Sequence, residues 1–319
     1  MTRYLLRKIP SAILVLFLAS VLIFFVLRLV PGDAATTLAG PDATEDSIAA
    51  IKSQLGLDKS IPAQYFSWLA GVLTFDLGRS FVIGGSISDL VVDGLTNTIV
   101  LASAALLLAV VVSVTLSVAS VAWPKRWLTA LVNGANTLAV ALPPFVSGVL
   151  LVLVFAVLLP VLPAGGIPPD GYWARPDITV QYLLLPAICL ALPVGAALTR
   201  FLTESLRSEL RQPYITTARS LGVSQRNLVL QSALRNALPS AVTALGLQTG
   251  QLLGGAVLVE AIFAWPGIGQ LIEQGISRRD YPVVQVLLLL SVSVFVLVQL
   301  LTDVVHAYLD PRIRIGGVS

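Results

Sequence analysis

The chain has 319 residues, of which 56% are hydrophobic and only 12% charged, and its mean hydropathy is +0.89. A soluble domain carries about a quarter charged residues, so half that share indicates that lipid is the main solvent. The net charge of +3 is too small to suggest a nucleic-acid ligand, the single cysteine excludes a disulfide within the chain, and the single histidine excludes a histidine cluster.

Six segments are apolar and long enough to cross a bilayer, which takes about 20 helical residues. The predicted spans are residues 9–30, 98–123, 128–159, 180–202, 240–263 and 283–309. The first span follows Arg3, Arg7 and Lys8, as the apolar region of a signal peptide would. That region has only about 7–15 residues, and this span is longer, so it is expected to remain as a membrane anchor. Pro143 and Pro144 predict a break or kink in the third span. The predicted fold class is an all-α integral membrane protein with six transmembrane helices.

The distribution of Lys and Arg orients these spans, because cytoplasmic segments carry the excess of basic residues. The segments outside the spans are residues 1–8, 31–97, 160–179, 203–239, 264–282 and 310–319. With the N-terminus inside, thirteen basic residues lie on the cytoplasmic side and six outside, Arg28 lying at the outer end of the first span. Residues 31–97 carry eight acidic residues against three basic ones, which suits the outer side. We therefore expect both termini in the cytoplasm.

The outer segment 31–97 is expected to contain short helices, in "DATEDSIAAIKSQLGL" and "IPAQYFSWLAGVL". In the second, Tyr65, Trp68 and Leu69 share one apolar face. The favoured interpretation is a cap on the membrane surface with its aromatic rings at headgroup level, and the alternative is a dedicated substrate contact.

The sequence lacks the motifs of catalysis and nucleotide binding. It contains no G-x-x-x-x-G-K-[ST] phosphate loop, no H-E-x-x-H and no nucleophile elbow. His306 lies within the last span, and Glu204, Glu260 and Asp303 lie toward span ends, where they can reach headgroups or water. We therefore expect a non-catalytic chain with no metal site and no cofactor of its own.

Residues 214–239, "YITTARSLGVSQRNLVLQSALRNALP", interrupt this apolar pattern. Tyr214, Ala218 and Leu221 fall on one face of a short helix, Gly222 can end that helix in the left-handed conformation, and Ser224 can cap the next one. The pattern predicts two short amphipathic helices joined at Gly222, the second carrying apolar residues at helical spacing from Leu230 to Leu238.

Two interpretations fit this basic segment: it lies on anionic lipid, or one of its helices docks in a groove of a partner protein. A helix that lies on the membrane gains nothing from a glycine turn followed by a new cap. The bend therefore favours docking, with Arg219 as a charged contact and Arg226 and Arg235 free to bind lipid phosphates instead.

"TTARSLG" resembles the EAA motif of ABC-importer permeases, with Thr216, Thr217, Ala218 and Gly222 at the four motif positions. Thr216 departs from the acidic residue of the general motif, but a Tyr-Ile-x-Thr-Ala-Arg version is typical of the dipeptide/oligopeptide/nickel branch. The stretches "LRLVPGDAA", "LPPFVSGVLLVLVFAVLLPVLPAGG", "VEAIFAWPGIGQLIEQGISRRDYPVVQ" and "YLDPRIR" resemble that branch too, and the long outer segment resembles the first of its two permeases.

This resemblance implies a type I importer permease in a bacterial cytoplasmic membrane, with the permease domain at about residues 94–309. The implied partners are a second homologous permease, two ATP-binding subunits or one fused ATPase that bind ATP and Mg²⁺, an extracytoplasmic substrate-binding protein, and membrane lipid. The expected cargo is di- or oligopeptides, with nickel chelates, glutathione or haem as alternatives and a secondary carrier less favoured. The residues implied in ATPase coupling are Tyr214, Thr216, Thr217, Ala218, Arg219, Gly222 and Arg226.

The translocation path between two such permeases is expected to pass the third to fifth spans. Its candidate residues here are Gln248, Gln251 and Glu260. The nearby glycines at 250, 254 and 255 are better explained by close helix packing than by a role in the path.

Overall fold

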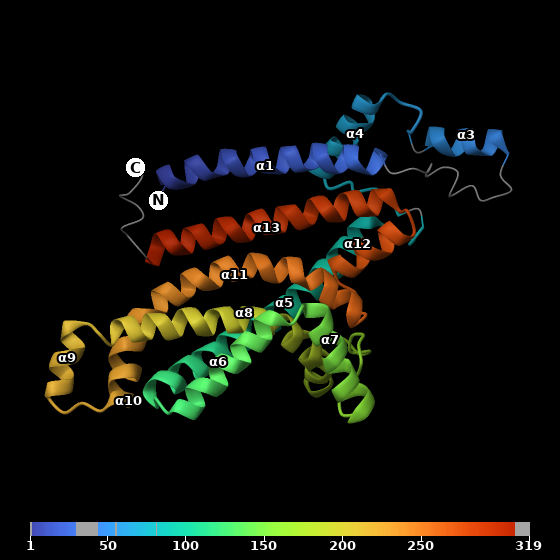
Figure 1. Cartoon of the computed structure of the whole chain (residues 1–319). Helices are drawn as coiled ribbons and strands as arrows, with labels where there is room; N and C mark the ends of the chain where they lie inside the picture. The colour runs from blue at the N-terminus through green and yellow to red at the C-terminus, as the bar shows by residue number, and fades with distance from the viewer. Residues whose placement is uncertain (1, 30–43, 55, 81, 310–319) are drawn as a thin grey trace. The chain divides into compact units, whose positions relative to one another are not determined.

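The structure is a computed structural model that describes residues 2–29, 44–54, 56–80 and 82–309 (Figure 1). The stretch "PGDAA", most of the tail "YLDPRIR" and the side chain of His306 lie outside the described residues. The helices are α1 (Thr2–Leu29), α3 (Glu45–Gln54), α4 (Ile61–Leu73), α5 (Ile87–Ala122), α6 (Arg126–Ala141), α7 (Pro144–Val152), the π-helix η1 (Leu153–Leu158), α8 (Pro176–Glu209), α9 (Pro213–Ser220), α10 (Gln225–Asn227), the π-helix η2 (Leu228–Ala233), α11 (Leu234–Ile262), α12 (Ile268–Ser277) and α13 (Tyr281–Leu309). The described part of the chain is therefore nearly all helical.

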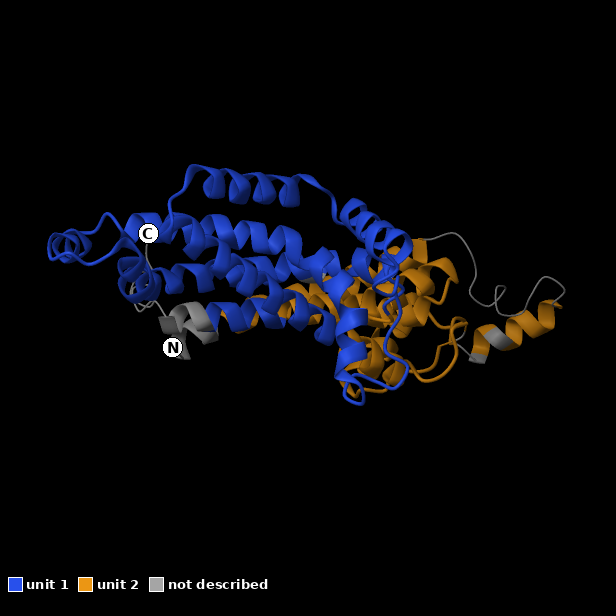
Figure 2. Ribbon diagram, turned by 90° about the horizontal axis from the view of Figure 1, so that it is seen from below, with its two compact units in different colours: residues 1, 99–265, 297–319 blue, residues 2–98, 266–296 orange. Residues whose placement is uncertain are grey.

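The helices form two compact units, which Figure 2 colours separately. Unit 1 contains residues 99–265 and 297–319, and unit 2 contains residues 2–98 and 266–296. The boundaries between the units fall inside α5, between α11 and α12, and inside α13, so each unit is assembled from segments far apart in the sequence.

The core of unit 1 is built around α8. Its buried residues Leu185 and Leu190 belong to one apolar cluster with Leu101 of α5 and Val259 of α11. Small residues let these helices approach closely: a Cβ atom on Gly195 would lie 3.5 Å from the Cα atom of Ala109.

The helix that starts the third predicted span is broken at the two prolines, as the sequence predicts. α6 ends at Ala141 and α7 begins at Pro144, and the two helical pieces are bent by 106°. Leu142 and Pro143 have extended backbones because a residue before proline is sterically pushed out of the helical conformation.

Unit 2 packs α4 onto α1 through an aromatic cluster. The Tyr65 ring meets the Phe24 ring edge to face at 5.1 Å, and the Tyr65 hydroxyl shares a hydrogen bond of 2.9 Å with Ser20. The guanidinium of Arg28 lies 3.5 Å from the centroid of the Phe24 ring. Tyr65 and Trp68 therefore both contact the Phe24 ring of α1. Their position at headgroup level stays a prediction.

A buried carboxylate in unit 2 ties two distant parts of the chain together. Asp280, before α13, accepts hydrogen bonds from the Ser80 hydroxyl at 2.5 Å and from the backbone N–H groups of Val82 and Ile83 at 3.0 and 3.1 Å. Ser80 in turn accepts the N–H of Gly84 at 2.8 Å. The loop before α5 is thus held by side-chain hydrogen bonds to the start of α13.

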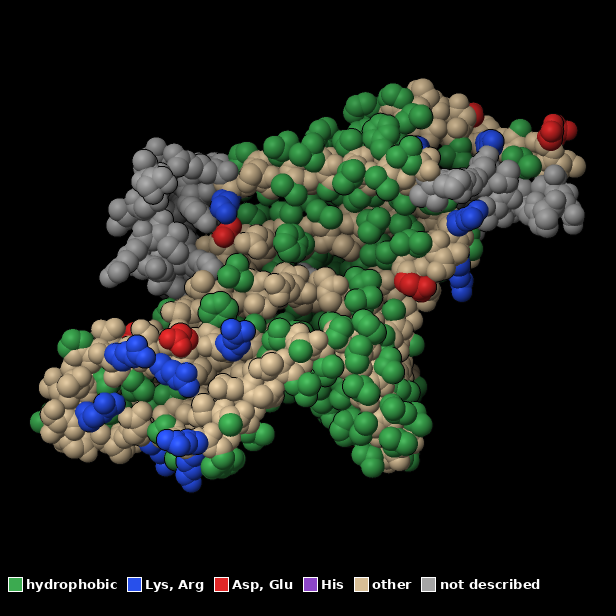
Figure 3. Space-filling view, in the orientation of Figure 1, with side chains coloured by type: hydrophobic (Ala, Val, Ile, Leu, Met, Phe, Trp, Pro, Cys, Tyr) green, Lys and Arg blue, Asp and Glu red, His purple; other side chains and the backbone are tan. Residues whose placement is uncertain are grey.

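The surface of the long helices is apolar, as Figure 3 shows in green. Among the described residues, four helices are long and apolar enough to cross a membrane, and the number rises to six if each of two bent helix pairs is one span. All six helical segments start before the predicted spans, and two of them start well before: α5 starts at Ile87, and a continuous helical run into α11 starts at Gln225.

Candidate coupling segment and translocation path

The segment that follows α8 contains the predicted bend at Gly222. α9 begins with Pro213 in its first turn, where a missing backbone N–H costs nothing, and it ends at Ser220. Gly222 has a φ angle of +85°, and the N–H groups of Gly222 and Val223 donate to the carbonyls of Arg219 and Ala218. This pair of hydrogen bonds is a Schellman motif, which favours glycine because other residues are strained at positive φ.

The next helix starts where the sequence predicts, at Ser224. The Ser224 hydroxyl accepts the backbone N–H of Asn227 at 3.5 Å, a long capping hydrogen bond. The bend at Gly222 and the cap at Ser224 are therefore both confirmed.

The second helix differs from the prediction, because it is not short. α10, η2 and α11 follow one another without a gap, and Pro239 lies inside α11 instead of separating a surface helix from a span. The buried residues of this run are Leu228, Val229, Ala233 and Ala237, whereas Leu230 and Leu238 are exposed. The predicted set of apolar residues is therefore right in its middle, where Ala233 and Ala237 are buried and Leu234 packs against them, and wrong at its ends. The π-helix η2 inserts an extra residue per turn, which departs from the 3.6-residue spacing.

α9 is fastened to the spans by two residues at its start. Ile215 is fully buried, and the hydroxyl of Tyr214 donates to the Glu209 carboxylate at 2.8 Å while it accepts from the Asn236 amide at 2.8 Å. These bonds link α9 to the end of α8 and to α11. Burial raises the pKa of the Tyr214 hydroxyl, the bond from Asn236 lowers it, and the bond to Glu209 raises it. Tyr214 thus serves an internal contact, and its ring is only partly exposed.

The far side of the bend is fastened to α5. Gln225 accepts a hydrogen bond from the Arg219 guanidinium at 3.2 Å and donates to the carbonyl of Val121 at 3.4 Å. The Arg226 guanidinium lies 5.7 Å from the centre of the Trp123 ring. Below these contacts, one apolar cluster joins Val121 and the end of α5 to α8 and the start of α11. The bend therefore cannot move independently of these helices.

The tip of the bend is exposed and partly apolar. Leu221 is 80% exposed, and Thr216, Thr217, Arg219 and Val223 are exposed beside it, while Ala218 is half-buried. Figure 3 shows Lys and Arg side chains gathered at the end of unit 1 that carries α9 and α10. An apolar tip surrounded by basic residues is suited to a partner's groove. The contact to an ATPase stays a prediction for all seven coupling residues.

The three candidate path residues differ in exposure. Gln251 is exposed and Gln248 is half-buried on α11, whereas Glu260 in the last turn is fully buried. A role in the translocation path stays a prediction for all three, and the burial of Glu260 favours a structural role for it.

Close helix packing involves a glycine that the sequence did not single out. A Cβ atom on Gly246 would lie 2.0 Å from the Cγ2 atom of Thr302 on α13, whereas Gly254 has open space and Gly255 has only the flexible tip of Leu190 at 3.4 Å. Gly246 therefore allows α11 and α13 to touch. Small-residue spacing was a signal for this contact, but it did not identify the residue.

Among the residues that the structure describes, no group of three or more His, Cys, Asp and Glu side chains is placed to hold a metal ion. The lone Cys189 is buried and contacts Ser147 and the carbonyl of Pro144.

Two family models match the chain from end to end. Residues 109–315 match the model described as "Binding-protein-dependent transport system inner membrane component". Residues 1–102 match the model described as the N-terminal part of such membrane components.

Curated relatives match over the same length. The chain is similar to proteins named "Glutathione transport system permease protein GsiC", with 35% identity to those of Salmonella paratyphi A and Salmonella typhimurium and 34% to that of Escherichia coli K12. Each match covers 98% of this chain and 99% of the relative.

Proposed function

The chain belongs to the family of binding-protein-dependent transport system inner membrane components, and we propose that it carries di- or oligopeptides into the cell. It is an inner-membrane permease of the ABC importers of the peptide and oligopeptide family. Proteins of this kind act with a partner permease, ATPase subunits and a substrate-binding protein. The identity of these partners, the six-span topology with both termini inside, and the cargo are parts of the proposal.

The bend at Gly222 carries the proposal for coupling. Its tip exposes Leu221 and Arg219, and its base is bonded to α5, α8 and α11 through Gln225, Tyr214 and the apolar cluster. An ATPase groove that holds the tip would therefore pull on three spans at once. Closure of the ATPase pair would switch the two permeases between inward-open and outward-open packings.

The chain's own composition supports a division of labour. It lacks a phosphate-binding loop, so ATP and Mg²⁺ would be bound by the partner subunits. This permease would then act without catalysis, by binding and releasing cargo between two membrane arrangements.

Glutathione is a second candidate cargo, because the relatives at 34 and 35% identity are named glutathione transport permeases. Glutathione is itself a tripeptide, so the two candidates share amide groups and terminal charges. Nickel chelates and haem are weaker alternatives, because the described residues hold no cluster of metal ligands.

The class of the complex is tested by purifying the tagged chain from its own membranes in mild detergent and identifying its partners by mass spectrometry. A stoichiometric second permease with ATPase subunits is the expected result. A chain that arrives alone in every gentle detergent would refute the coupling proposal, favour a secondary carrier and make residues 214–239 a lipid-binding segment.

The cargo is tested with the reconstituted complex and its binding protein in proteoliposomes. We expect ATP-dependent uptake of a labelled dipeptide that unlabelled oligopeptides inhibit by competition. Uptake of glutathione with no competition from other peptides would establish the second candidate instead.

A further inference from the structure

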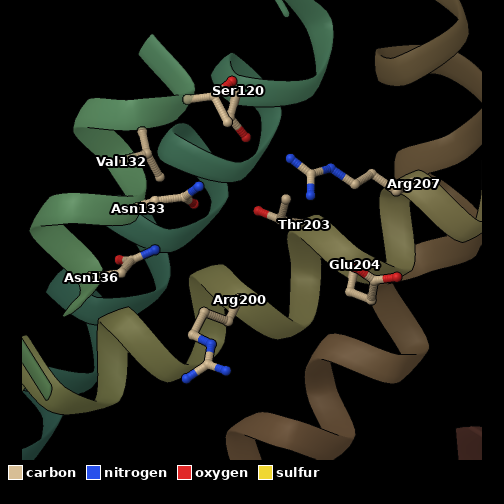
Figure 4. Close-up of a pocket in the computed structure, with 9 residues that line it drawn as sticks. Ser120, Val132, Asn133, Asn136, Arg200, Thr203, Glu204 and Arg207 are labelled. Atoms are coloured by element: carbon tan, nitrogen blue, oxygen red, sulfur yellow. The ribbon is translucent and has the colours of Figure 1, made fainter. Parts of the chain in front are cut away.

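Beside the coupling segment, unit 1 contains an open pocket of about 180 Å³ between α5, α6 and α8 (Figure 4). Its α6 wall is formed by Thr129, Val132, Asn133 and Asn136. Its α8 wall is formed by Arg200, Thr203, Glu204 and Arg207. Both sets have the spacing i, i+3, i+4, i+7, so each is one face of its helix and the two faces oppose each other. The end of α5 adds Ser120.

The side chains that point into the pocket are mainly hydrogen-bond donors. Figure 4 shows Arg207, Thr203 and Asn133 directed toward the space between the helices, while Glu204 and the guanidinium of Arg200 turn away from it. Glu204 therefore does not neutralise the guanidinium of Arg207, and no hydrogen bond or ion pair joins Arg200 or Arg207 to another residue of the described chain. The pocket has an unneutralised positive charge.

One hydroxyl in the pocket is left without a partner. The Oγ1 atom of Thr203 is buried and makes no hydrogen bond, whereas one turn earlier Thr199 donates to the carbonyl of Gly195 at 2.7 Å. A buried hydroxyl without a hydrogen-bond partner is destabilising, because it has lost its bonds to water. A ligand oxygen in the pocket would satisfy Thr203 and the guanidinium of Arg207 together.

The position of the pocket relative to the membrane surface indicates which molecule supplies that oxygen. The apolar part of α5 ends at Trp123, and Trp123 and Trp127 are both exposed next to Lys125 and Arg126. Exposed Trp beside basic residues is the pattern of a membrane–water interface. The 34 residues of α8 span about 51 Å, more than the about 30 Å of a hydrocarbon core. Its last turns, which carry Arg207, therefore extend to the level of lipid headgroups.

We propose that this pocket binds the phosphate of a phospholipid headgroup, held by Arg207 with Thr203 and Asn133, while Arg200 adds positive charge at the edge of the pocket. Basic pockets between spans on the cytoplasmic side are suited to anionic headgroups. The bound lipid would bridge α6 and α8 next to the bend that couples them to the ATPase. The rival ligand is the carboxylate of a peptide on its way through the permease.

The test counts phospholipids retained by the full-length chain, purified with its partner subunits, by native mass spectrometry. Arg207→Gln removes a charge-assisted hydrogen bond to the phosphate, which should weaken lipid binding about tenfold. Arg200→Gln removes only a nearby positive charge and should weaken lipid binding less. Arg207→Lys retains the charge and should retain part of the binding. Arg211→Gln, at an exposed arginine outside the pocket, is the matched control and should retain the wild-type lipid count.

Two further arms identify the source of the anion. In delipidated wild-type protein, phosphatidylglycerol should rebind and inorganic phosphate should not displace it; displacement would make this a site for free anions and overturn the lipid proposal. Unchanged lipid retention in the double variant Arg200→Gln, Arg207→Gln would also overturn it. If that variant loses peptide uptake while it retains the lipid, the pocket belongs to the translocation path.

Discussion

At the scale of the residue, the coupling segment depends on a few atoms with defined partners. Gly222 supplies a backbone conformation with φ of +85°, and Tyr214 supplies a hydroxyl that bonds to both Glu209 and Asn236. Neither residue makes this contribution by burying apolar surface. Each can be removed by a substitution that leaves the surrounding volume almost unchanged, so coupling is separable from folding by mutation.

Replacement of Gly222 by valine tests the bend. A Cβ atom there meets nothing within 4 Å, so the cost is confined to the backbone, about 1–2 kcal/mol for a residue in the left-handed region. We expect insertion and assembly to be retained, and the cargo carried per ATP hydrolysed to fall about fivefold or more. Gly134→Val is the control, because Gly134 has equally open surroundings inside a helix. Equal transport per ATP in both variants would contradict the coupling role of Gly222.

Replacement of Tyr214 by phenylalanine tests the link between α9 and the spans. The ring remains while the hydrogen bonds to Glu209 and Asn236 are lost, each worth about 1 kcal/mol. We expect the amides of α9 to exchange with deuterium about fivefold faster or more, measured by mass spectrometry. Tyr182→Phe, whose hydroxyl has no partner in the described residues, should leave this exchange rate unchanged. Wild-type exchange in the Tyr214 variant would mean that Ile215 alone holds the helix.

At the scale of the element, two irregularities decide which faces are buried. The proline pair at 143 and 144 separates α6 from α7 and bends their path by 106°. The π-helix η2 changes the helical spacing before α11, so Val229 joins Ala233 on the core face while Leu230 is exposed. Packing of α11 against α13 then requires a residue without a side chain at 246.

The packing at Gly246 is tested by a pair of substitutions. Gly246→Ala places a methyl group 2.0 Å from the Cγ2 atom of Thr302, so the two helices must separate, at a cost of about 1–3 kcal/mol. We expect a lower midpoint of thermal unfolding in detergent. Thr302→Ala removes the colliding atom, so the double variant should recover most of the loss. Gly255→Ala is the control, since its Cβ atom meets only the flexible end of Leu190 at 3.4 Å. Absence of recovery in the double variant would show that Thr302 is not the obstacle.

At the scale of the whole molecule, the charge distribution predicts the orientation in the membrane. Thirteen Lys and Arg residues lie on the proposed cytoplasmic side and six on the other side. The coupling segment belongs to the basic side, where ATPases would dock. The acidic outer segment precedes α5, in the unit that also holds the buried Asp280.

The orientation is tested by labelling introduced cysteines in intact cells. The natural Cys189 is buried and should not react, so it serves as the internal background. Ser60→Cys, at an exposed residue of the outer segment, should react with a membrane-impermeant maleimide. Ser220→Cys, exposed beside the bend, should react only after the membrane is permeabilised. The reverse pattern would place the coupling segment outside and refute the proposed topology.

The sequence by itself determined the features that depend on local chemistry. Apolar runs identified a membrane protein, the proline pair located the break after α6, and Gly222 with Ser224 located the bend and the next cap. Each of these follows from backbone conformation, or from transfer to lipid, of a few neighbouring residues. The motif around Ala218 and Gly222 also indicated the family, and the matching family models and relatives support that assignment over nearly the whole chain.

Only the tertiary structure decided which surfaces face one another. It assigned Tyr214 to an internal hydrogen bond, buried Glu260, shifted the core face of α11 by a π turn, and selected Gly246 as the point of close approach. It also placed Arg207 opposite Asn133 in one pocket. The periodicity of a sequence identifies an apolar face of a helix but not the element that packs against it. Which face is buried is determined by packing against a specific neighbouring helix.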